Sequence, residues 1–147
     1  MIRHGNSVSN EAMIKLIEKH GDQLNVGHFC DKFYRKDMID CSLTELGIQE
    51  CLKAGQHALK IPFEEVWISP LRRTLETAFH IFKNHPNFGS IKFKVEPLLR
   101  EKIRVPPDMP SRHLVAEGFQ ELFNGNLDLS LMKGFDFEKV WYFDSLD

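Results

Sequence analysis

The sequence predicts a single α/β domain over residues 1–147, a three-layer α/β/α sandwich with a mostly parallel sheet. Two observations lead to this fold class. A chain of 147 residues, 42% of them hydrophobic, has the ordinary size of one domain and can bury roughly two-thirds of its unfolded surface. Segments of helical periodicity alternate along it with short strand-like segments, which is the order typical of a parallel sheet covered by helices.

The first half of the chain predicts two helices separated by an irregular stretch. Residues 9–20 carry apolar side chains at helical spacing, and Gly21 is a typical C-terminal cap. Residues 22–40 show no clear period, which indicates either a functional surface loop or an excursion near a site. Residues 42–60 predict the second helix, because Ser42 and Glu45 have capping-box spacing and apolar residues follow on one face.

The second half predicts two strands, each followed by a helix or a loop. EVWIS at residues 65–69 is typical of a buried strand and leads into a helix over 70–84, with Pro70 in its first turn. Residues 91–96 alternate apolar and charged side chains, as a half-exposed strand does. The remaining elements are an irregular loop over 102–110, a fourth helix over 111–123 capped by Ser111, and a strand or apolar loop over 138–143. The predicted core contains Val66, Trp67, Ile68, Leu75, Phe79, Phe93 and Val95.

Charge and cysteine content exclude several classes of protein. The net charge is −2, with 19 basic and 21 acidic residues, so nothing global attracts the chain to nucleic acid or to an anionic membrane. Three cysteines match neither a zinc spacing nor a disulfide framework, which fits a reducing compartment. No apolar run approaches the roughly 18 residues of a membrane span. We therefore predict a soluble, cytoplasmic protein.

The stretch RHGNSVSN at residues 3–10 has the composition of an anion site at a strand-to-helix junction. Gly5 would let the backbone approach a phosphate, Arg3 offers a planar fork for its oxygens, and Ser7 and Asn10 can add hydrogen bonds. His4 would face the phosphorus atom, and a neutral imidazole is a competent nucleophile near pH 7. The competing interpretation is a surface arginine beside a capping histidine.

ISPLRRTLETA repeats this arrangement further along the chain. It delivers Arg72 and Arg73 in the first turn of a helix, where the helix dipole disfavours cations, so the two need either solvent or an anion to balance them. An anion shared with Arg3 would do so. The competing interpretation is two solvated arginines, one of them paired with Glu76.

Together these segments resemble the histidine phosphatase superfamily, which also contains the cofactor-dependent phosphoglycerate mutases. RHGxSxxN matches residues 3–10. DxxLTxxGxxQ resembles DCSLTELGIQ at residues 40–49, where the Asp, Leu, Thr and Gly match and the glutamine lies one position early. SPLxRxxxTA matches residues 69–78. The last match singles out Arg73 as the phosphate-binding arginine. The acidic residue of the family matches Glu101 in LLRE.

The resemblance implies a two-step phosphoryl transfer without metal or cofactor. His4 would attack the phosphoryl group and Glu101 would protonate the departing oxygen; water would then attack the phosphohistidine with Glu101 as base. Arg3 and Arg73, with neighbouring donors, would hold the phosphate charge. A solvated Glu101 is the alternative, with Glu96 as a rival acid.

The sequence departs from the family at both ends. Only Met1 and Ile2 precede the RHG motif, where a strand of about five or six residues is expected. The family places a second histidine after a late strand, and we do not assign His113 to that role because no apolar strand precedes it. We therefore expect a partial domain: a fragment, a shortened inactive relative, or a pocket completed by another chain. Loss of one preorganised donor would cost on the order of 10²–10³ in rate.

Among family activities, we predict a phosphatase acting on a phosphorylated small molecule or a phosphoprotein. A mutase is less favoured, because thirty positions separate Asn10 from Asp40. The alternatives are a catalytically impaired phosphate-binding or protein-interaction relative, and an unrelated α/β domain in which the site residues do not converge. Exposed sheet edges would permit self-association.

Overall fold

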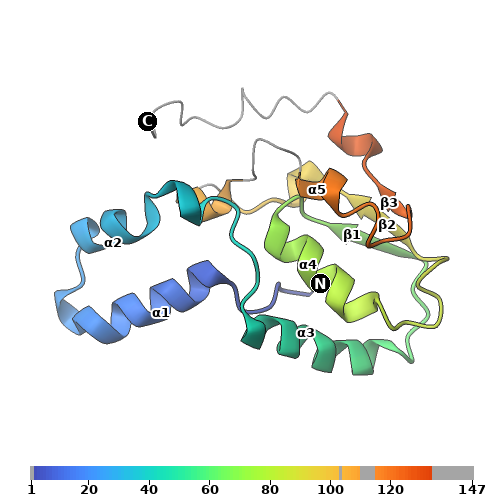
Figure 1. Cartoon of the computed structure of the whole chain (residues 1–147), viewed down its shortest axis with the longest axis horizontal. Helices are drawn as coiled ribbons and strands as arrows, with labels where there is room; N and C mark the ends of the chain where they lie inside the picture. Colours follow the sequence, from blue (N-terminus) through green and yellow to red (C-terminus); the bar gives the residue numbers. More distant parts are fainter. Residues whose placement is uncertain (1, 103, 110–114, 134–147) are drawn as a thin grey trace.

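Helices and a parallel sheet alternate along the chain, as the periodicity predicts (Figure 1). The structure is a computed structural model that describes residues 2–102, 104–109 and 115–133. Strands β1 (Glu65–Ile68), β2 (Lys92–Val95) and β3 (Leu127–Asp128) pair in parallel in the order β1-β2-β3. The predicted α/β class and the parallel sheet are therefore confirmed.

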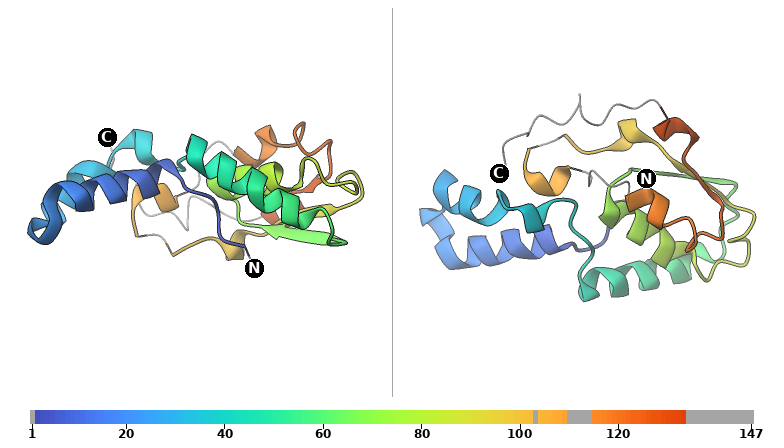
Figure 2. Two further views of the ribbon diagram at one scale, coloured as in Figure 1. Left: turned by 90° about the horizontal axis from the view of Figure 1, so that it is seen from below. Right: turned by 45° about the horizontal axis from the view of Figure 1, so that its top comes forward.

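The helices fall into two groups. The α-helices of the described residues are α1 (Val8–His20), α2 (Val26–Phe33), α3 (Glu45–Ala58), α4 (Arg72–Phe82) and the single turn α5 (Val115–Gly118). Short 3-10 turns lie at Gly21–Gln23, Lys36–Met38, Pro97–Leu99, Pro106–Asp108 and Ser130–Met132. Helices α3, α4 and α5 gather at the sheet, whereas α1 and α2 form a hairpin that extends beyond it (Figure 2).

The main core lies between the sheet and helices α3, α4 and α5. Strand alternation puts Val66 and Ile68 beside Phe93 and Val95 on the face that these helices cover. Phe93 and Val95 are fully buried, as is Leu75 of α4. The predicted core residues that the structure places in this cluster or against it are Val66, Ile68, Leu75, Phe79, Phe93 and Val95.

Trp67 corrects the core prediction, because it lies on the opposite face of the sheet. Its side chain is 50% exposed, and its indole Nε1 donates to Glu65 at 3.3 Å. Lys94 lies 5.0 Å from the Trp67 ring centroid and also pairs with Glu65 at 2.8 Å. No helix of the described residues covers this face, so two of the three predicted layers are present in that part of the chain. Side chains of the run EVWI therefore alternate between the apolar core, where Val66 and Ile68 lie, and the exposed face of the sheet, where Trp67 lies.

The edge of β1 opposite β2 is unpaired within the described residues. Lys92 N donates to Glu64 O and Glu96 N donates to Ile68 O, so the even-numbered residues of β1 direct their backbone groups toward β2. The odd-numbered residues Glu65 and Trp67 therefore direct theirs toward the open edge. Self-association through this edge stays a prediction.

The prediction of an irregular stretch over residues 22–40 is wrong, because α2 lies within it. Asn25 caps α2 by accepting from His28 N at 3.1 Å. Phe33 and Met38 pack against Ala12 and Leu16 of α1. Together with Cys41 these residues form a second apolar cluster. Phe29 and Phe33 of α2, four residues apart, thus face α1, and this packing stabilises a helix of only eight residues.

Helix ends differ from prediction by a few residues. Gly21 ends α1 with φ of 47°, as predicted. The cap of α3 is Thr44 rather than Ser42, because the Thr44 side chain accepts from Gly47 N at 3.1 Å. Helix α4 begins at Arg72 with Leu71 as its N-cap, so Pro70 precedes the helix instead of lying in its first turn.

The predicted fourth helix ends earlier than expected. It is helical over Val115–Gly118, and residues 119–125 continue as turns. The predicted cap Ser111, His113 and the segment 138–143 lie outside the described residues.

Candidate active site

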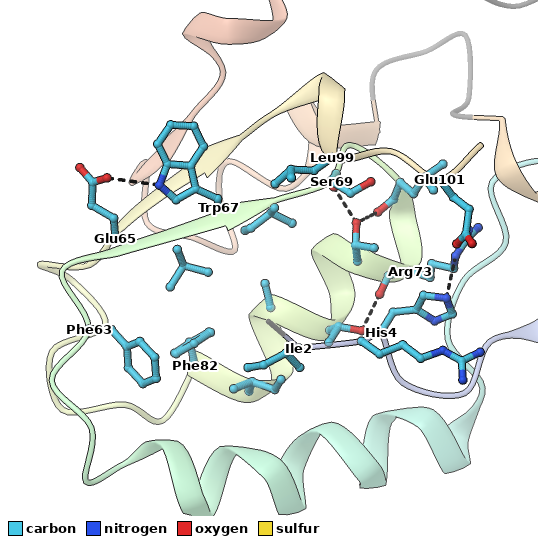
Figure 3. Close-up of a pocket in the computed structure, with 18 residues that line it drawn as sticks. Ile2, His4, Phe63, Glu65, Trp67, Ser69, Arg73, Phe82, Leu99 and Glu101 are labelled. Atoms are coloured by element: carbon cyan, nitrogen blue, oxygen red, sulfur yellow. Dashed lines mark hydrogen bonds and ion pairs between the residues drawn. The ribbon is translucent and has the colours of Figure 1, made fainter. Parts of the chain in front are cut away.

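A groove of about 630 Å³ lies between the N-terminal segment, α4 and the open edge of β1. We call it the site groove. Its lining is polar at one end, where His4, Arg73 and Glu101 lie, and apolar at the other, where Phe63 and Phe82 lie (Figure 3). The polar end adjoins the C-terminal end of β1, which is where open α/β sheets collect ligands.

Hydrogen bonds to two helices hold the N-terminal segment at the groove. Gly5 N donates to the Thr77 side chain of α4 at 3.1 Å. Thr44 N, at the start of α3, donates to Asn6 O at 2.9 Å, and Asn6 N donates to Glu50 of α3 at 2.8 Å. Helix α4, through Thr77, and helix α3, through Thr44 and Glu50, therefore position the segment that carries His4.

Two glycines allow the N-terminal segment to lie against the backbone of α3. A Cβ at Gly5 would come within 2.7 Å of Gly47 O. A Cβ at Gly47 would overlap the carbonyl oxygen of Asn6. The RHG glycine is thus required for close backbone packing, and its predicted role in the approach of phosphate stays a prediction.

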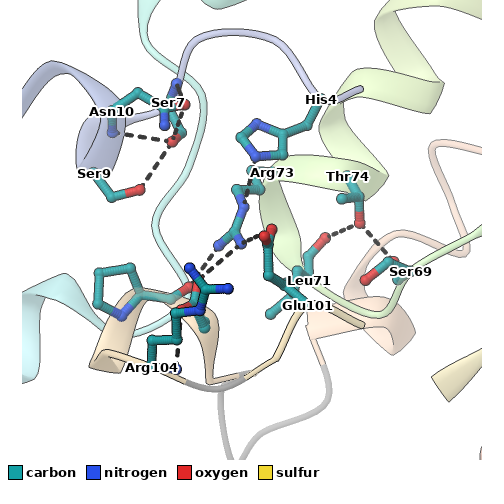
Figure 4. Close-up of polar contacts among 12 residues, drawn as sticks. His4, Ser7, Ser9, Asn10, Ser69, Leu71, Arg73, Thr74, Glu101 and Arg104 are labelled. Atoms are coloured by element: carbon teal, nitrogen blue, oxygen red, sulfur yellow. Dashed lines mark hydrogen bonds and ion pairs between the residues drawn. The ribbon is translucent and has the colours of Figure 1, made fainter. Parts of the chain in front are cut away.

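His4 presents an unprotonated ring nitrogen, Nε2, to Arg73 at the groove. A carbonyl only accepts hydrogen bonds, so the 2.8 Å contact between His4 Nδ1 and Gly5 O assigns the ring proton to Nδ1. Nε2 keeps its lone pair and accepts from Arg73 Nε at 3.2 Å (Figure 4). This is the tautomer that a histidine nucleophile needs.

The surroundings of His4 favour its neutral form. Burial lowers the pKa of His4 below its ordinary value, and the nearby charges of Arg73 and Arg3 lower it further. The Gly5 carbonyl and Glu101 act in the opposite direction without reversing the shift. The imidazole is therefore uncharged at neutral pH.

Arg73 is the buried cation of the site. It is 3% exposed and lies in the first turn of α4. Its Nη1 donates to Pro107 O at 2.6 Å, and its Nη2 lies 3.3 Å from an oxygen of Asp108 and 3.8 Å from one of Glu101. Arg72, in contrast, is exposed and lies 3.6 Å from Glu76, so the motif's choice of Arg73 agrees with the geometry.

The structure brings four predicted residues to the polar end of the groove: Arg3, His4, Arg73 and Glu101. Glu101 is 59% exposed, so its carboxyl group is accessible to solvent beside the buried guanidinium. Arg3 is exposed at the rim. The interpretation of an unrelated domain with scattered side chains is therefore not supported.

Ser7 and Asn10 occupy a different position from the one predicted. Ser7 is fully buried, its hydroxyl donates to Asn10 Oδ1 at 2.9 Å, and the two residues form the capping box of α1. They thus fix the start of the helix that follows the RHG motif. They are not among the described residues that line the groove, and their role as phosphate ligands stays a prediction.

Sequence reasoning missed Thr77 and Asp108. Thr77 belongs to the SPLxRxxxTA match, so its place in the motif was a usable signal. Asp108 lies in the proline-rich loop, where no pattern marked it.

Some expectations stay untested. In the described residues no group of three or more His, Cys, Asp or Glu could hold a metal ion. The same part of the chain contains no helix both long and apolar enough to cross a membrane. Cytoplasmic localisation and a single domain over 1–147 stay predictions.

Comparison with known proteins identifies the family of this chain. A family model described as Histidine phosphatase superfamily (branch 1) matches residues 31–122. That range contains the LT segment, Arg73 and Glu101, and it begins after His4.

Two curated relatives have phosphatase names. "Fructose-2,6-bisphosphatase TIGAR B" of Danio rerio is 32% identical over 85 residues, covering 57% of this chain and 33% of the relative. "Serine/threonine-protein phosphatase Pgam5, mitochondrial" of Drosophila grimshawi is 32% identical over 120 residues, covering 80% of this chain and 38% of the relative. The chain thus spans about a third of the length of the first and somewhat more than a third of the second. Because the family model covers more than half of the chain, the chain belongs to the histidine phosphatase superfamily, and its α/β fold is phosphoglycerate mutase-like.

Proposed function

We propose that this chain is a phosphatase-type domain that transfers a phosphoryl group from a phosphomonoester to water through a phosphohistidine at His4. The observation that carries the proposal is the contact of His4 Nε2 with the buried Arg73 at 3.2 Å, with Glu101 on the same guanidinium. A nucleophile with a fixed tautomer, an anion-binding cation and an accessible carboxyl group thus meet at one end of the groove.

In the first step, the lone pair of His4 Nε2 attacks the phosphorus atom and the bond from phosphorus to the ester oxygen breaks. Glu101 donates a proton to that oxygen, so the alcohol leaves neutral. The Gly5 carbonyl stabilises the positive charge of the phosphohistidine ring, because it accepts from Nδ1–H.

In the second step, water attacks the phosphohistidine. The water oxygen bonds to phosphorus and the bond from phosphorus to His4 Nε2 breaks. Glu101, now a carboxylate, accepts a proton from this water. Phosphate leaves, and His4 and Glu101 return to their starting states.

Arg73 and Arg3 would hold the charge on the transferring phosphoryl oxygens. Since phosphoryl transfer depends mainly on positioning and electrostatic stabilisation, a buried guanidinium is well suited to it. Arg73 Nε now donates to the lone pair that must attack, so phosphate binding has to draw the guanidinium off Nε2.

A phosphate-binding relative without turnover is the second candidate. The observation that favours it is that His4 is the one histidine among the described residues that line the groove. Such a protein would bind phosphate through Arg73 but transfer it slowly or not at all.

The names of the two relatives suggest two substrate classes for this chain. One is a sugar bisphosphate and the other is a phosphoserine or phosphothreonine protein. Release of inorganic phosphate from fructose 2,6-bisphosphate and from a phosphoserine peptide, measured side by side, would discriminate between them.

The test of the proposed function is hydrolysis of a generic aryl phosphate by wild type and His4→Ala, with His57→Ala as a control on the exposed side of α3. We expect turnover that His57→Ala retains and His4→Ala loses, together with an acid-labile phosphohistidine at His4 by mass spectrometry. Phosphate binding without turnover in wild type would favour the binder. Equal turnover in wild type and His4→Ala would exclude the mechanism.

A further inference from the structure

The segment 104–109, which we call the strap, lies directly against the guanidinium of Arg73. Pro107 O accepts from Nη1 at 2.6 Å and Asp108 Oδ1 accepts from Nη2 at 3.3 Å. The third nitrogen, Nε, donates to His4.

These two acceptors resemble the ligand that the site is proposed to bind. A bidentate phosphate offers two oxygens to the two Nη groups of an arginine, with negative charge on them. The strap offers a carbonyl oxygen and a carboxylate oxygen to the same two groups. Asp108 is 14% exposed on its side chain, so this carboxylate neutralises Arg73 in a setting shielded from water.

The strap has its own attachments, which do not involve Arg73. Tyr34 at the end of α2 donates from its hydroxyl to Arg104 O at 3.3 Å. Val105 packs against the apolar cluster between α1 and α2, and Pro106 is fully buried. Within the strap, Asp108 Oδ2 accepts from Arg104 N at 3.2 Å, which orients the carboxylate.

We propose that the strap is an autoinhibitory contact: Asp108 and the Pro107 carbonyl hold the phosphate-binding donors of Arg73, and an anion must displace them to bind. This inference rests on the proposed function, because it assigns Arg73 to phosphate. It adds that the described structure is a closed state of the site. The α1–α2 hairpin, through Tyr34 and Val105, is the support on which the strap rests.

The test measures binding of inorganic phosphate by titration calorimetry. Asp108→Asn keeps the shape and one acceptor but removes the competing charge, so we expect the dissociation constant to fall about tenfold. Asp31→Asn is the matched control: it removes the same charge from an exposed position on α2 and should leave the constant unchanged. Arg73→Gln in the Asp108→Asn background should abolish binding.

A second measurement uses the unmodified chain. The amides of Asp108 and Met109 donate to Val105 O and Pro106 O at 2.9 and 3.0 Å. We expect their hydrogen exchange to accelerate when saturating phosphate is added, because the strap leaves Arg73. Unchanged exchange on saturation would overturn the displacement.

The outcomes separate the two proposals. Arg73-dependent binding in wild type that Asp108→Asn leaves unchanged or weakens would overturn the strap and leave the proposed function standing. Tighter binding in Asp108→Asn with aryl phosphate turnover that does not need His4 would support the strap and overturn the phosphohistidine. Absence of phosphate binding in every folded variant, as judged by circular dichroism, would overturn both.

Discussion

Thr77 is the residue through which α4 holds the segment that carries His4, and Thr77→Val tests this support. The Thr77 hydroxyl donates to Arg73 O at 2.6 Å and accepts from Gly5 N at 3.1 Å. The side chain is 6% exposed, so no solvent replaces the hydroxyl when it is lost. Valine has nearly the same shape and leaves Gly5 N–H without an acceptor.

An unsatisfied buried N–H costs about 1–3 kcal/mol. For a chain of 147 residues each kcal/mol lowers Tm by about 3 °C, so we expect a decrease of roughly 3–9 °C. If the segment relaxes to find another partner, His4 moves with it, because it adjoins Gly5. A displacement of about 1 Å can reduce turnover by up to roughly 10²-fold.

The assay compares aryl phosphate turnover and thermal unfolding of Thr77→Val, Thr77→Ser and Thr74→Val. Thr77→Ser retains the hydroxyl and should behave like wild type. Thr74→Val also loses a hydroxyl on α4, but that hydroxyl bonds Ser69 O and Leu71 O, so turnover per folded molecule should persist. If Thr77→Val matched Thr77→Ser in both turnover and Tm, the proposed support for His4 would be refuted.

Other substitutions and titrations test separate features. Gly47→Ala should destabilise the fold by at least about 1–3 kcal/mol and reduce turnover. Gly55→Ala is the control, because its Cβ would come within 2.7 Å of an α4 carbonyl. It should destabilise the fold but leave turnover per folded molecule unchanged. The His4 ring should titrate below pH 6.5 by NMR; since the unfolded state then binds more protons, the free energy of unfolding should decrease as pH falls below 6.5, and titration above 6.5 would contradict the described burial. Cys30 is exposed and should react with a thiol reagent in the native state, while burial raises the pKa of Cys41 to about 11, so its labelling should require denaturant.

The sheet and its covering helices were predictable because their apolar patterns are strong. Ile91, Phe93 and Val95 alternate with lysines, and the structure buries all three on one face. The stripe of α4 is equally regular. Trp67 was misplaced because an uninterrupted run such as EVWI does not reveal which of its side chains faces the core.

Helix α2 has only a short local signal, consisting of the cap Asn25 and the helical spacing of Val26, Phe29, Cys30 and Phe33, and the sequence analysis overlooked it. It is eight residues long and includes Val26 and Gly27, which have weak helix propensity, and its stability comes from contacts with α1. Contacts between segments distant in the sequence carry no periodic signal. The same limit explains why Asp108, 35 positions beyond Arg73, gave no sign of its contact with the guanidinium.

The motifs located the polar end of the site, and the roles that they assign to its residues stay predictions. His4, Arg73 and Glu101 converge, as their order in the motifs predicts. Ser7 and Asn10 belong to the same motif yet cap a helix, because a motif records which residues are needed together and not which atom each one contacts.

The way in which residues 2–6 are seated affects how this molecule would lose activity. They have no regular secondary structure, and individual hydrogen bonds tie them to α3 and α4 rather than a ladder of bonds to a neighbouring strand. Detaching such a segment takes less free energy than separating the packed helices from the sheet. In a urea titration, the proposed phosphatase turnover would therefore be lost at a lower urea concentration than the helical ellipticity at 222 nm.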